Sequence, residues 1–216
     1  MDFSLLYQYR DQYLEGFIHT IQSSLTGFLC SYLIGMILAL FRLLPISFFN
    51  KLARVFIEFV QYIPLLLFVF FFYIGLPALG LPLNGFTAGT IGLCIYTGTF
   101  IGEAIHNGVQ SIPKGQMEAA KASGLSYVQA MRYVILPQAT KNIFPALGNQ
   151  LINLIKNSSI LGIVAGVDLM YQTNLINENS FHVSSIYLLV AIFYLILIVP
   201  LSFFVAYLER HWMKNV

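Results

Sequence analysis

The sequence predicts an all-α membrane protein that crosses the bilayer five times, with the N-terminus outside and the C-terminus in the cytoplasm. Three observations support this prediction. The chain is 58% hydrophobic and only 9% charged, with a mean hydropathy of +0.77; it contains long runs without any charge; and its basic residues gather in particular loops. A soluble domain carries about 25% charged residues because its surface faces water. The composition therefore excludes a soluble enzyme, a nucleic-acid-binding protein and a disordered chain.

Charge-free runs locate the spans, since a helix needs about 20 apolar residues to cross the hydrocarbon core. Residues 59–102 are long enough for two helices, and the glycine- and proline-rich stretch 75–85 predicts the turn between them. We expect the first apolar segment to be retained, because no basic region or small-residue cleavage site marks a signal peptide. The chain is then one transmembrane domain, 1–216, with spans near 16–41, 57–76, 86–106, 142–165 and 184–208.

A β-barrel would also satisfy backbone hydrogen bonds in lipid. It requires strands of about ten residues in which polar and apolar side chains alternate. The stretch 65–72 is uninterruptedly apolar and shows no alternation. Helices are therefore the predicted spanning elements.

The orientation follows from the basic residues, because lysine and arginine collect in cytoplasmic loops. The predicted loops at 77–85 and 166–183 contain none. The first loop, the third loop and the C-terminal tail hold nearly all of them: Arg42, Lys51, Arg54, Lys114, Lys121, Arg132, Lys141, Arg210 and Lys214. An odd number of spans places the termini on opposite sides, in agreement with this distribution.

A topology reporter tests this orientation. We expect a reporter fused after Asn84 to lie outside the cell and one fused after Lys114 to lie in the cytoplasm. Alkaline phosphatase and green fluorescent protein fusions at the two sites provide the measurement. The opposite pattern of activities would overturn the prediction.

The cytoplasmic loop 107–141 is too long for a simple helix hairpin, whose connections usually have about 2–8 residues. Pro113 precedes a helix-forming run, 116–123, that Gly124 ends. A second short helix opens with a capping box of Ser126 and Gln129 and is expected to close at Pro137. These signals predict a helix–turn–helix on the cytoplasmic face. By itself it fits either an amphipathic connector on the headgroups or a docking element.

A resemblance favours docking. Glu118-Ala119-Ala120, Gly124 and Val134-Ile135-Leu136-Pro137 resemble the EAA motif of bacterial ABC-importer membrane subunits, which is EAA, three residues, G, nine residues and I-x-L-P. The only departure is Val134 in place of isoleucine. The motif also lies, as in that family, in a cytoplasmic loop before the penultimate span.

The resemblance extends along most of the chain to the polar amino acid (His/Gln/Arg-type) permeases. Residues 58–66 resemble their E-x-x-R-G-T-P-L-L segment, residues 102–112 resemble A-E-x-x-R-x-G-I-Q-S-I, and residues 136–139, 145–149 and 156–159 match further segments. Two departures stand out. Gln61-Tyr62-Ile63 replaces R-G-T, and His106 replaces the usual arginine, so any role of those arginines does not transfer to this chain.

The resemblance implies that the loop helix docks into a separate ATPase subunit. The coupling residues would be Glu118, Ala119, Ala120, Lys121, Ser123, Gly124 and Pro137. The chain contains no G-x-x-x-x-G-K-[ST] loop, so it is expected to bind no cofactor, with ATP and Mg²⁺ on the partner. The expected partners are two copies of the ATPase, a second permease subunit that is identical or paralogous, an extracytoplasmic amino-acid-binding protein and the lipid bilayer, and no nucleic acid.

Polar residues inside the spans are candidates for the translocation path, since such groups usually face protein or water. The candidates are Gln61, Glu103, Gln150, Asn153, Lys156, Asn157 and Ser158. Gln150, Asn153 and Asn157 follow an i, i+3, i+7 spacing and so share one helix face, which hydrogen bonding between helices would explain equally well. Lys156 either extends to the outer interface or lines the path. Glu103 has a gating or structural role, with His106, a loop residue or a partner subunit as its possible contact.

These features together predict the permease subunit of an ATP-driven amino acid importer in the bacterial cytoplasmic (inner) membrane. In the resemblance the position of Gln150 is acidic in some carriers of basic amino acids, so its amide favours glutamine, glutamate or another polar substrate. The alternatives are an intramembrane enzyme and an ATP-independent carrier or channel. An enzyme would need a convergent catalytic set, whereas the four histidines, at 19, 106, 182 and 211, are scattered. A carrier does not explain the EAA-type loop.

Overall fold

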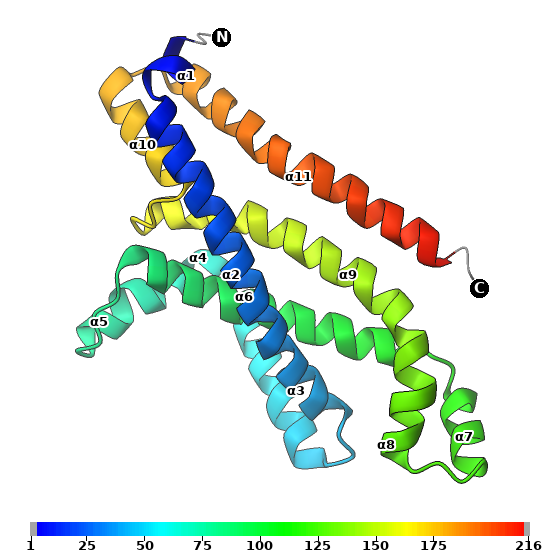
Figure 1. Ribbon diagram of the computed structural model, residues 1–216. Coiled ribbons are helices and arrows are strands. Elements are labelled where there is room, and N and C mark those ends of the chain that lie inside the picture. The colour runs from blue at the N-terminus through cyan, green and yellow to red at the C-terminus, as the bar shows by residue number, and fades with distance from the viewer. Residues whose placement is uncertain (1–3, 214–216) are drawn as a thin grey trace.

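A computed structural model describes residues 4–213, with the side chains described as far as His211. Within this range the chain forms helices and connecting loops, with no strand (Figure 1). The elements in chain order are α1 (Ser4–Gln8), α2 (Arg10–Leu43), α3 (Ser47–Tyr62), α4 (Leu65–Phe70), η1 (Phe71–Gly75), α5 (Leu76–Ala78), α6 (Gly85–Gln110), α7 (Lys114–Ala122), α8 (Tyr127–Ala130), η2 (Met131–Ile135), α9 (Leu136–Asn157), η3 (Ser158–Ile163), α10 (Leu169–Ser180) and α11 (Val183–Met213). The all-helical prediction is confirmed.

Three helices are long and apolar enough to cross a bilayer by themselves: α2, α6 and α11. They contain the predicted spans 16–41, 86–106 and 184–208. The turn expected between the second and third spans is also present, because Asn84 caps α6 by accepting a hydrogen bond from the backbone N–H of Thr87 at 2.8 Å. Each of these three helices extends beyond the charge-free run that predicted it.

The predicted span 57–76 is not one helix. Its first residues belong to α3, which begins at Ser47, and the chain then bends by 103° into the segment Leu65–Ala78. Pro64 causes the break, because a proline ring disfavours the helical conformation of the residue before it. Ile63 is accordingly extended, with φ −89° and ψ 129°. The bent pair is apolar enough to count as a fourth span.

The predicted span 142–165 also differs from the structure. Helix α9 begins earlier, at Leu136, ends at Asn157, and gives way to the 3₁₀ turn η3. It is not among the helices apolar enough to be counted as spans by composition. Five spans, and the orientation of the chain, therefore stay predictions. The predicted loop 166–183 contains a short helix of its own, α10.

The contact between α2 and α6 is the centre of the molecule, and small residues allow it. In α2 the buried face is made largely of glycine and serine, including Ser31 and Gly35. Gly98 and Gly102 of α6 lie against this face, and a Cβ atom on Gly102 would be 3.1 Å from the carbonyl oxygen of Gly35. In lipid, such close approach of two backbones stabilises helix pairs by van der Waals packing.

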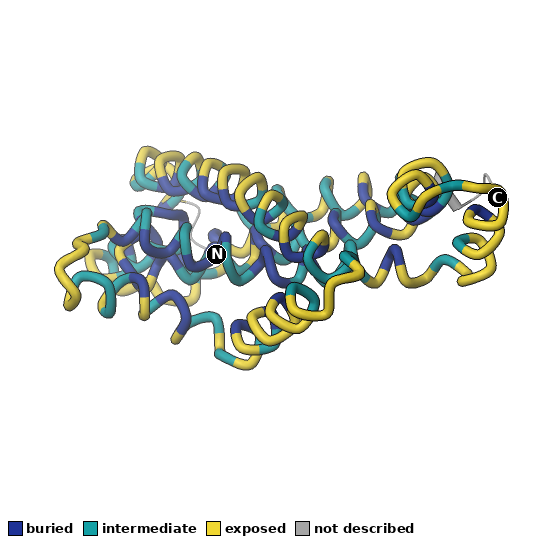
Figure 2. The backbone as a smooth tube through the Cα atoms, turned by 90° about the horizontal axis from the view of Figure 1, so that it is seen from below, coloured by how far each residue is buried: buried dark blue, intermediate teal, exposed yellow. Residues whose placement is uncertain are grey.

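The other helices surround this pair unequally. Over half of the apolar window of α6 is buried, whereas only 17% of the corresponding window of α11 is buried. Figure 2 shows long helical stretches with exposed residues along one side. On α11 these include Leu195, Ile196, Phe203 and Phe204. A surface this apolar fits contact with lipid or with another membrane subunit.

Candidate coupling and translocation site

Helix α7 carries the EAA-type motif and ends where the sequence predicts. Gly124 has a φ of +85°, a conformation that favours glycine. The backbone N–H of Leu125 donates to the carbonyl of Ala120 at 3.2 Å, and the N–H of Gly124 donates to the carbonyl of Lys121 at 2.9 Å. These two bonds form a Schellman motif, which satisfies the free carbonyls at the end of a helix. Gly124 therefore sets the direction in which the chain leaves α7.

The motif residues do not all face outward. Glu118, Ala119, Lys121 and Ser123 are exposed, whereas Ala120 is buried. Ser123 donates a hydrogen bond from its hydroxyl to the carbonyl of Ala119 at 3.0 Å. Of the predicted coupling residues on α7, Ala120 thus packs against the protein itself.

The second short helix begins as predicted. Ser126 accepts a hydrogen bond from the N–H of Gln129, and the Gln129 side chain accepts one from the N–H of Ser126 at 2.8 Å. The expected stop at Pro137 is wrong, because α8 leads through η2 directly into α9 (Figure 1). The π-type turn η2 ends two residues before Pro137, and such turns absorb a disruption of the hydrogen-bond ladder without ending the helix. A continuous helical path therefore joins α8 to α9.

A tyrosine connects this loop to α2. The hydroxyl of Tyr127 donates a hydrogen bond to the carbonyl of Leu43 at 2.7 Å. The ammonium group of Lys121 lies 5.8 Å from the centre of the Tyr127 ring. Burial raises the pKa of the Tyr127 phenol above its ordinary value, so the phenol keeps its proton and remains a donor at neutral pH. Sequence reasoning did not identify Tyr127.

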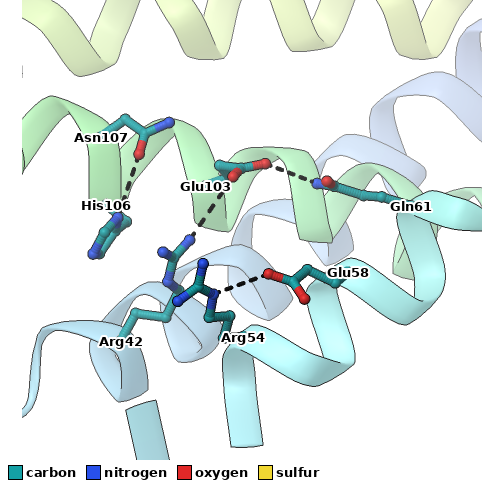
Figure 3. A network of polar contacts seen from close by, with 7 residues as sticks. All are labelled: Arg42, Arg54, Glu58, Gln61, Glu103, His106 and Asn107. Atoms are coloured by element: carbon teal, nitrogen blue, oxygen red, sulfur yellow. Dashed lines mark hydrogen bonds and ion pairs between the residues drawn. The ribbon is translucent and has the colours of Figure 1, made fainter. Parts of the chain in front are cut away.

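Gln61 and Glu103 lie at the junction of α2, α3 and α6 (Figure 3). The amide of Gln61 donates to Glu103 Oε2 at 3.1 Å. Arg42, in the last turn of α2, places Nη1 3.9 Å from Glu103 Oε1. The partners of Glu103 are thus Gln61, from another predicted span, and Arg42, which was assigned to the first loop by sequence. Its neighbour His106 instead contacts Asn107, with 3.3 Å between Nδ1 and Oδ1.

The neighbouring ion pair between Arg54 and Glu58 is local. Arg54 Nε lies 2.9 Å from Glu58 Oε1, and the two residues are one helical turn apart. Both side chains are largely exposed, so the pair contributes little to stability. Figure 3 shows it beside the Gln61–Glu103–Arg42 contact without a dashed line joining the two.

The three amides Gln150, Asn153 and Asn157 lie on α9, as their spacing predicts. All three are partly buried. Within the described part of the chain, none of the three side chains has a hydrogen bond. Hydrogen bonding to another helix of this same chain therefore does not explain the stripe, which leaves water, a ligand or a second subunit as its partner.

Ser158 and Lys156 do not extend this stripe. Ser158 begins η3 and is fully buried, and its hydroxyl donates to the carbonyl of Ile155 at 2.8 Å. The Ser158 hydroxyl therefore has its hydrogen-bond acceptor within the same helical segment. Lys156 is exposed and forms no ion pair among the described residues.

Asp168 is a buried residue that the sequence reasoning missed. Its carboxylate accepts hydrogen bonds from the backbone N–H groups of Met170 at 3.2 Å and Tyr171 at 3.0 Å, and so caps α10. Thr20 of α2 accepts a hydrogen bond from the N–H of Leu169 at 3.0 Å. Burial raises the pKa of Asp168 to about 6. The available signal was an aspartate directly before a helix-forming run, which is a common N-cap pattern.

Within residues 4–211 no group of three or more histidine, cysteine, aspartate or glutamate side chains is arranged to hold a metal ion. The described residues present instead a short exposed helix, α7, before the α8–η2–α9 path, an acid in contact with residues of two other helices, and a stripe of amides without hydrogen bonds. This arrangement suits the mechanical coupling and passage of a polar solute.

Comparisons with known proteins agree with this geometry. The family model described as "Binding-protein-dependent transport system inner membrane component" matches residues 31–214. The chain is 49% identical over 215 residues to a probable glutamine ABC transporter permease protein, GlnM, of Bacillus subtilis (strain 168), covering 100% of both chains. A second probable glutamine permease of that organism, GlnP, is 33% identical over 183 residues, which cover 83% of this chain and 84% of the relative.

Solved structures show the same fold. A chain from the crystal structure of an amino acid ABC transporter with histidines superposes with a TM-score of 0.92 at 32% identity, covering 98% of this chain and 99% of the other. A chain of the inward-facing MetNI methionine ABC transporter gives a TM-score of 0.79 at 20% identity, over 95% of this chain and 98% of the other. The second likeness concerns the fold alone.

Proposed function

Because this chain belongs to the family of inner-membrane components of binding-protein-dependent transport systems, we propose that it forms the translocation path of an importer for glutamine or a similar polar amino acid. It is a multi-pass component of the inner membrane and a transport subunit, not an enzyme. The single observation that carries the substrate is the 49% identity, along the whole chain, to a probable glutamine permease.

Helix α7 is the proposed contact with the ATPase. Its exposed residues Glu118, Ala119, Lys121 and Ser123 present small and charged groups to a partner, and Gly124 sets the angle of the helix. Pro137 follows η2 in the continuous helical path to α9. Closure of the ATPase subunits would pull α7 and, through α8 and η2, would tilt α9 and its amide stripe.

Membership in an ATP-binding-cassette importer implies an ATPase partner and a paired membrane subunit. We propose two ATPase copies that bind ATP and Mg²⁺, an external amino-acid-binding protein, and a second permease that is this chain again or a paralogue. Two features support such pairing: the exposed apolar surface of α11, and the α9 amides that lack hydrogen-bond partners within the described chain. A single chain with so few helices cannot enclose a path while its outer surfaces face lipid.

Gln150, Asn153 and Asn157 are the proposed solute contacts, with Lys156 beside them. An amide substrate can both donate to and accept from amide side chains, and the stripe has no other hydrogen-bonding partner among the described residues. Gln61 and Glu103 are proposed as the contact that closes the path between α3 and α6, with Ser158 in a structural role next to the stripe.

Uptake measurements test the path. We expect Gln150→Ala to raise the KM for glutamine uptake by about tenfold, the loss expected when one or two hydrogen bonds to a solute are removed. The measurement is ATP-driven uptake of labelled glutamine into vesicles that contain the whole transporter, with glutamate and arginine as competitors. Asn179→Ala is the matched control, because Asn179 is an exposed amide on a different helix, α10. Unaltered kinetics in Gln150→Ala would remove this residue from the path, and stronger competition by arginine than by glutamate would contradict the proposed substrate class.

A further inference from the structure

A cavity of about 350 Å³ lies between the cytoplasmic loop and the ends of two spanning helices. Its walls come from the last turn of α2, the end of α6, the inner face of α7, and the segment α8–η2. The hydrogen bond from Tyr127 to the carbonyl of Leu43 holds two of these walls together. None of the amides of the α9 stripe lines the cavity, and the cavity meets the Gln61–Glu103 contact through Arg42.

Positive charge dominates the lining. Arg42, Lys114 and Lys121 line the cavity, and Glu118 is the only acidic residue of the described chain that does. In the described part of the chain, neither lysine forms an ion pair with an acidic side chain, and neither does Glu118. The lining therefore carries more positive than negative charge, and among the described residues only Arg42 of its three cations has an acidic partner, Glu103.

Arg42 is the most deeply placed of these cations. Its side chain is only 15% exposed, and its Nε is buried without a hydrogen-bond partner. The remaining contact, 3.9 Å from Nη1 to Glu103, is too long for a direct hydrogen bond. A buried N–H of a cation without an acceptor is costly, so an anion that accepts from it would be stabilising.

The inner surface of the cavity is apolar. Val109 and Ile135 are buried core residues, and Met131 packs against the same cluster. Met117 of α7 belongs to this cluster as well. A ligand that reaches Arg42 would thus place an apolar portion on this surface, where removal from water favours binding.

We propose that this cavity binds an anion with an apolar body, its carboxylate or phosphate head on Arg42 and the two lysines at the rim. The body lies on Val109, Met131 and Ile135. The bound anion bridges α7 to α2 and so stiffens the connection between the docking helix and the spans. Two sources present this chemistry: a soluble organic acid from the cytoplasm, and an anionic lipid of the inner leaflet.

Hydrogen exchange of the backbone amides in residues 114–130 tests the proposal. The whole transporter, with its ATPase, is placed in phosphatidylcholine nanodiscs and titrated with sodium hexanoate at constant ionic strength, with neutral hexanamide as the matched compound. A second set of nanodiscs contains phosphatidylglycerol and no hexanoate. We expect exchange in α7 to slow saturably in one of the two series. Slowing with hexanoate identifies a soluble acid, and slowing with phosphatidylglycerol alone identifies a lipid headgroup.

Three variants make the result specific. Arg42→Gln and Lys114→Gln should each weaken the effect by about tenfold, as expected for the loss of one charged hydrogen bond. Lys114→Gln leaves the Arg42–Glu103 contact intact, so it keeps the test valid if Arg42→Gln misfolds. Lys51→Gln, an exposed cation that does not line the cavity, should behave as the unmodified protein. No slowing in either series, equal slowing with hexanamide, or equal slowing in all variants would overturn the proposal.

Discussion

Replacing Gly124 by aspartate should leave the protein in the membrane and abolish ATP-driven uptake while the ATPase continues to hydrolyse ATP. The Cβ atom itself meets no atom within 4 Å, so the effect does not come from a clash. It comes from the φ of +85°, which costs a side-chain-bearing residue about 1–2 kcal/mol. The new charge also lies at the C-terminal end of α7, where the helix dipole disfavours an anion. The Schellman turn would open and α7 would leave its docking angle.

Gly80→Asp is the matched control for this variant. Gly80 has nearly the same φ, +84°, and the same open space, but it lies between α5 and α6, far along the chain from the docking helix. Uptake into vesicles, ATP hydrolysis by the purified complex and the amount of protein in the membrane are measured for both variants. We expect at least a tenfold loss of uptake for Gly124→Asp alone, about the effect of 1.4 kcal/mol or more on a coupled step. Normal uptake in this variant would show that α7 does not transmit the motion of the ATPase.

A methyl group at Gly35 should destabilise the whole bundle. The added Cβ would clash with Ile101 Cγ2 and would lie 2.9 Å from the backbone nitrogen of Gly102. The second contact is with backbone, so α2 and α6 must move apart. Overpacking of this kind costs about 1–3 kcal/mol, and each kcal/mol lowers the Tm of a chain of this size by about 2–4 °C.

Gly27→Ala on the same helix is the control. Its Cβ would meet only the methyl groups of Leu154, at 3.6 Å, which is ordinary van der Waals contact. Thermal denaturation of the two variants in detergent, followed by loss of monodisperse protein, should give a lower Tm for Gly35→Ala and an unchanged one for Gly27→Ala. Equal midpoints would mean that the α2–α6 contact does not limit stability.

Local signals explain where sequence reasoning succeeded. The end of α7 at Gly124 and the capping box at Ser126 depend on residues within one helical turn of each other, and both are present. The i, i+3, i+7 amides are on one helix for the same reason. The charge-free runs located α2, α6 and α11 because the hydrophobic effect acts on each segment separately.

Two errors arose from reading prolines without their context. Pro64 breaks a run that hydropathy alone treats as one helix, and only the extended backbone at Ile63 reveals the 103° bend. Pro137 has the opposite outcome, since the π-type turn η2 before it keeps the helix continuous. Whether a proline ends a helix depends on whether neighbouring turns can accommodate its ring and its missing N–H.

The composition, the spacing of charges and the EAA-type motif by themselves determined the solvent of this protein, its all-helical class and its membership in a family of importer subunits. Each of these conclusions depends on residue types or on short spacings between residues, which the sequence gives without the fold. Only the tertiary structure decided that Glu103 contacts Gln61 and Arg42, that Ala120 faces inward, and that Arg42 lines a cavity with a free N–H. The contacts of Glu103 join residues distant in sequence, and they depend on how closely α2, α3 and α6 approach one another. Small side chains allow that approach, but its geometry appears only when the helices are packed.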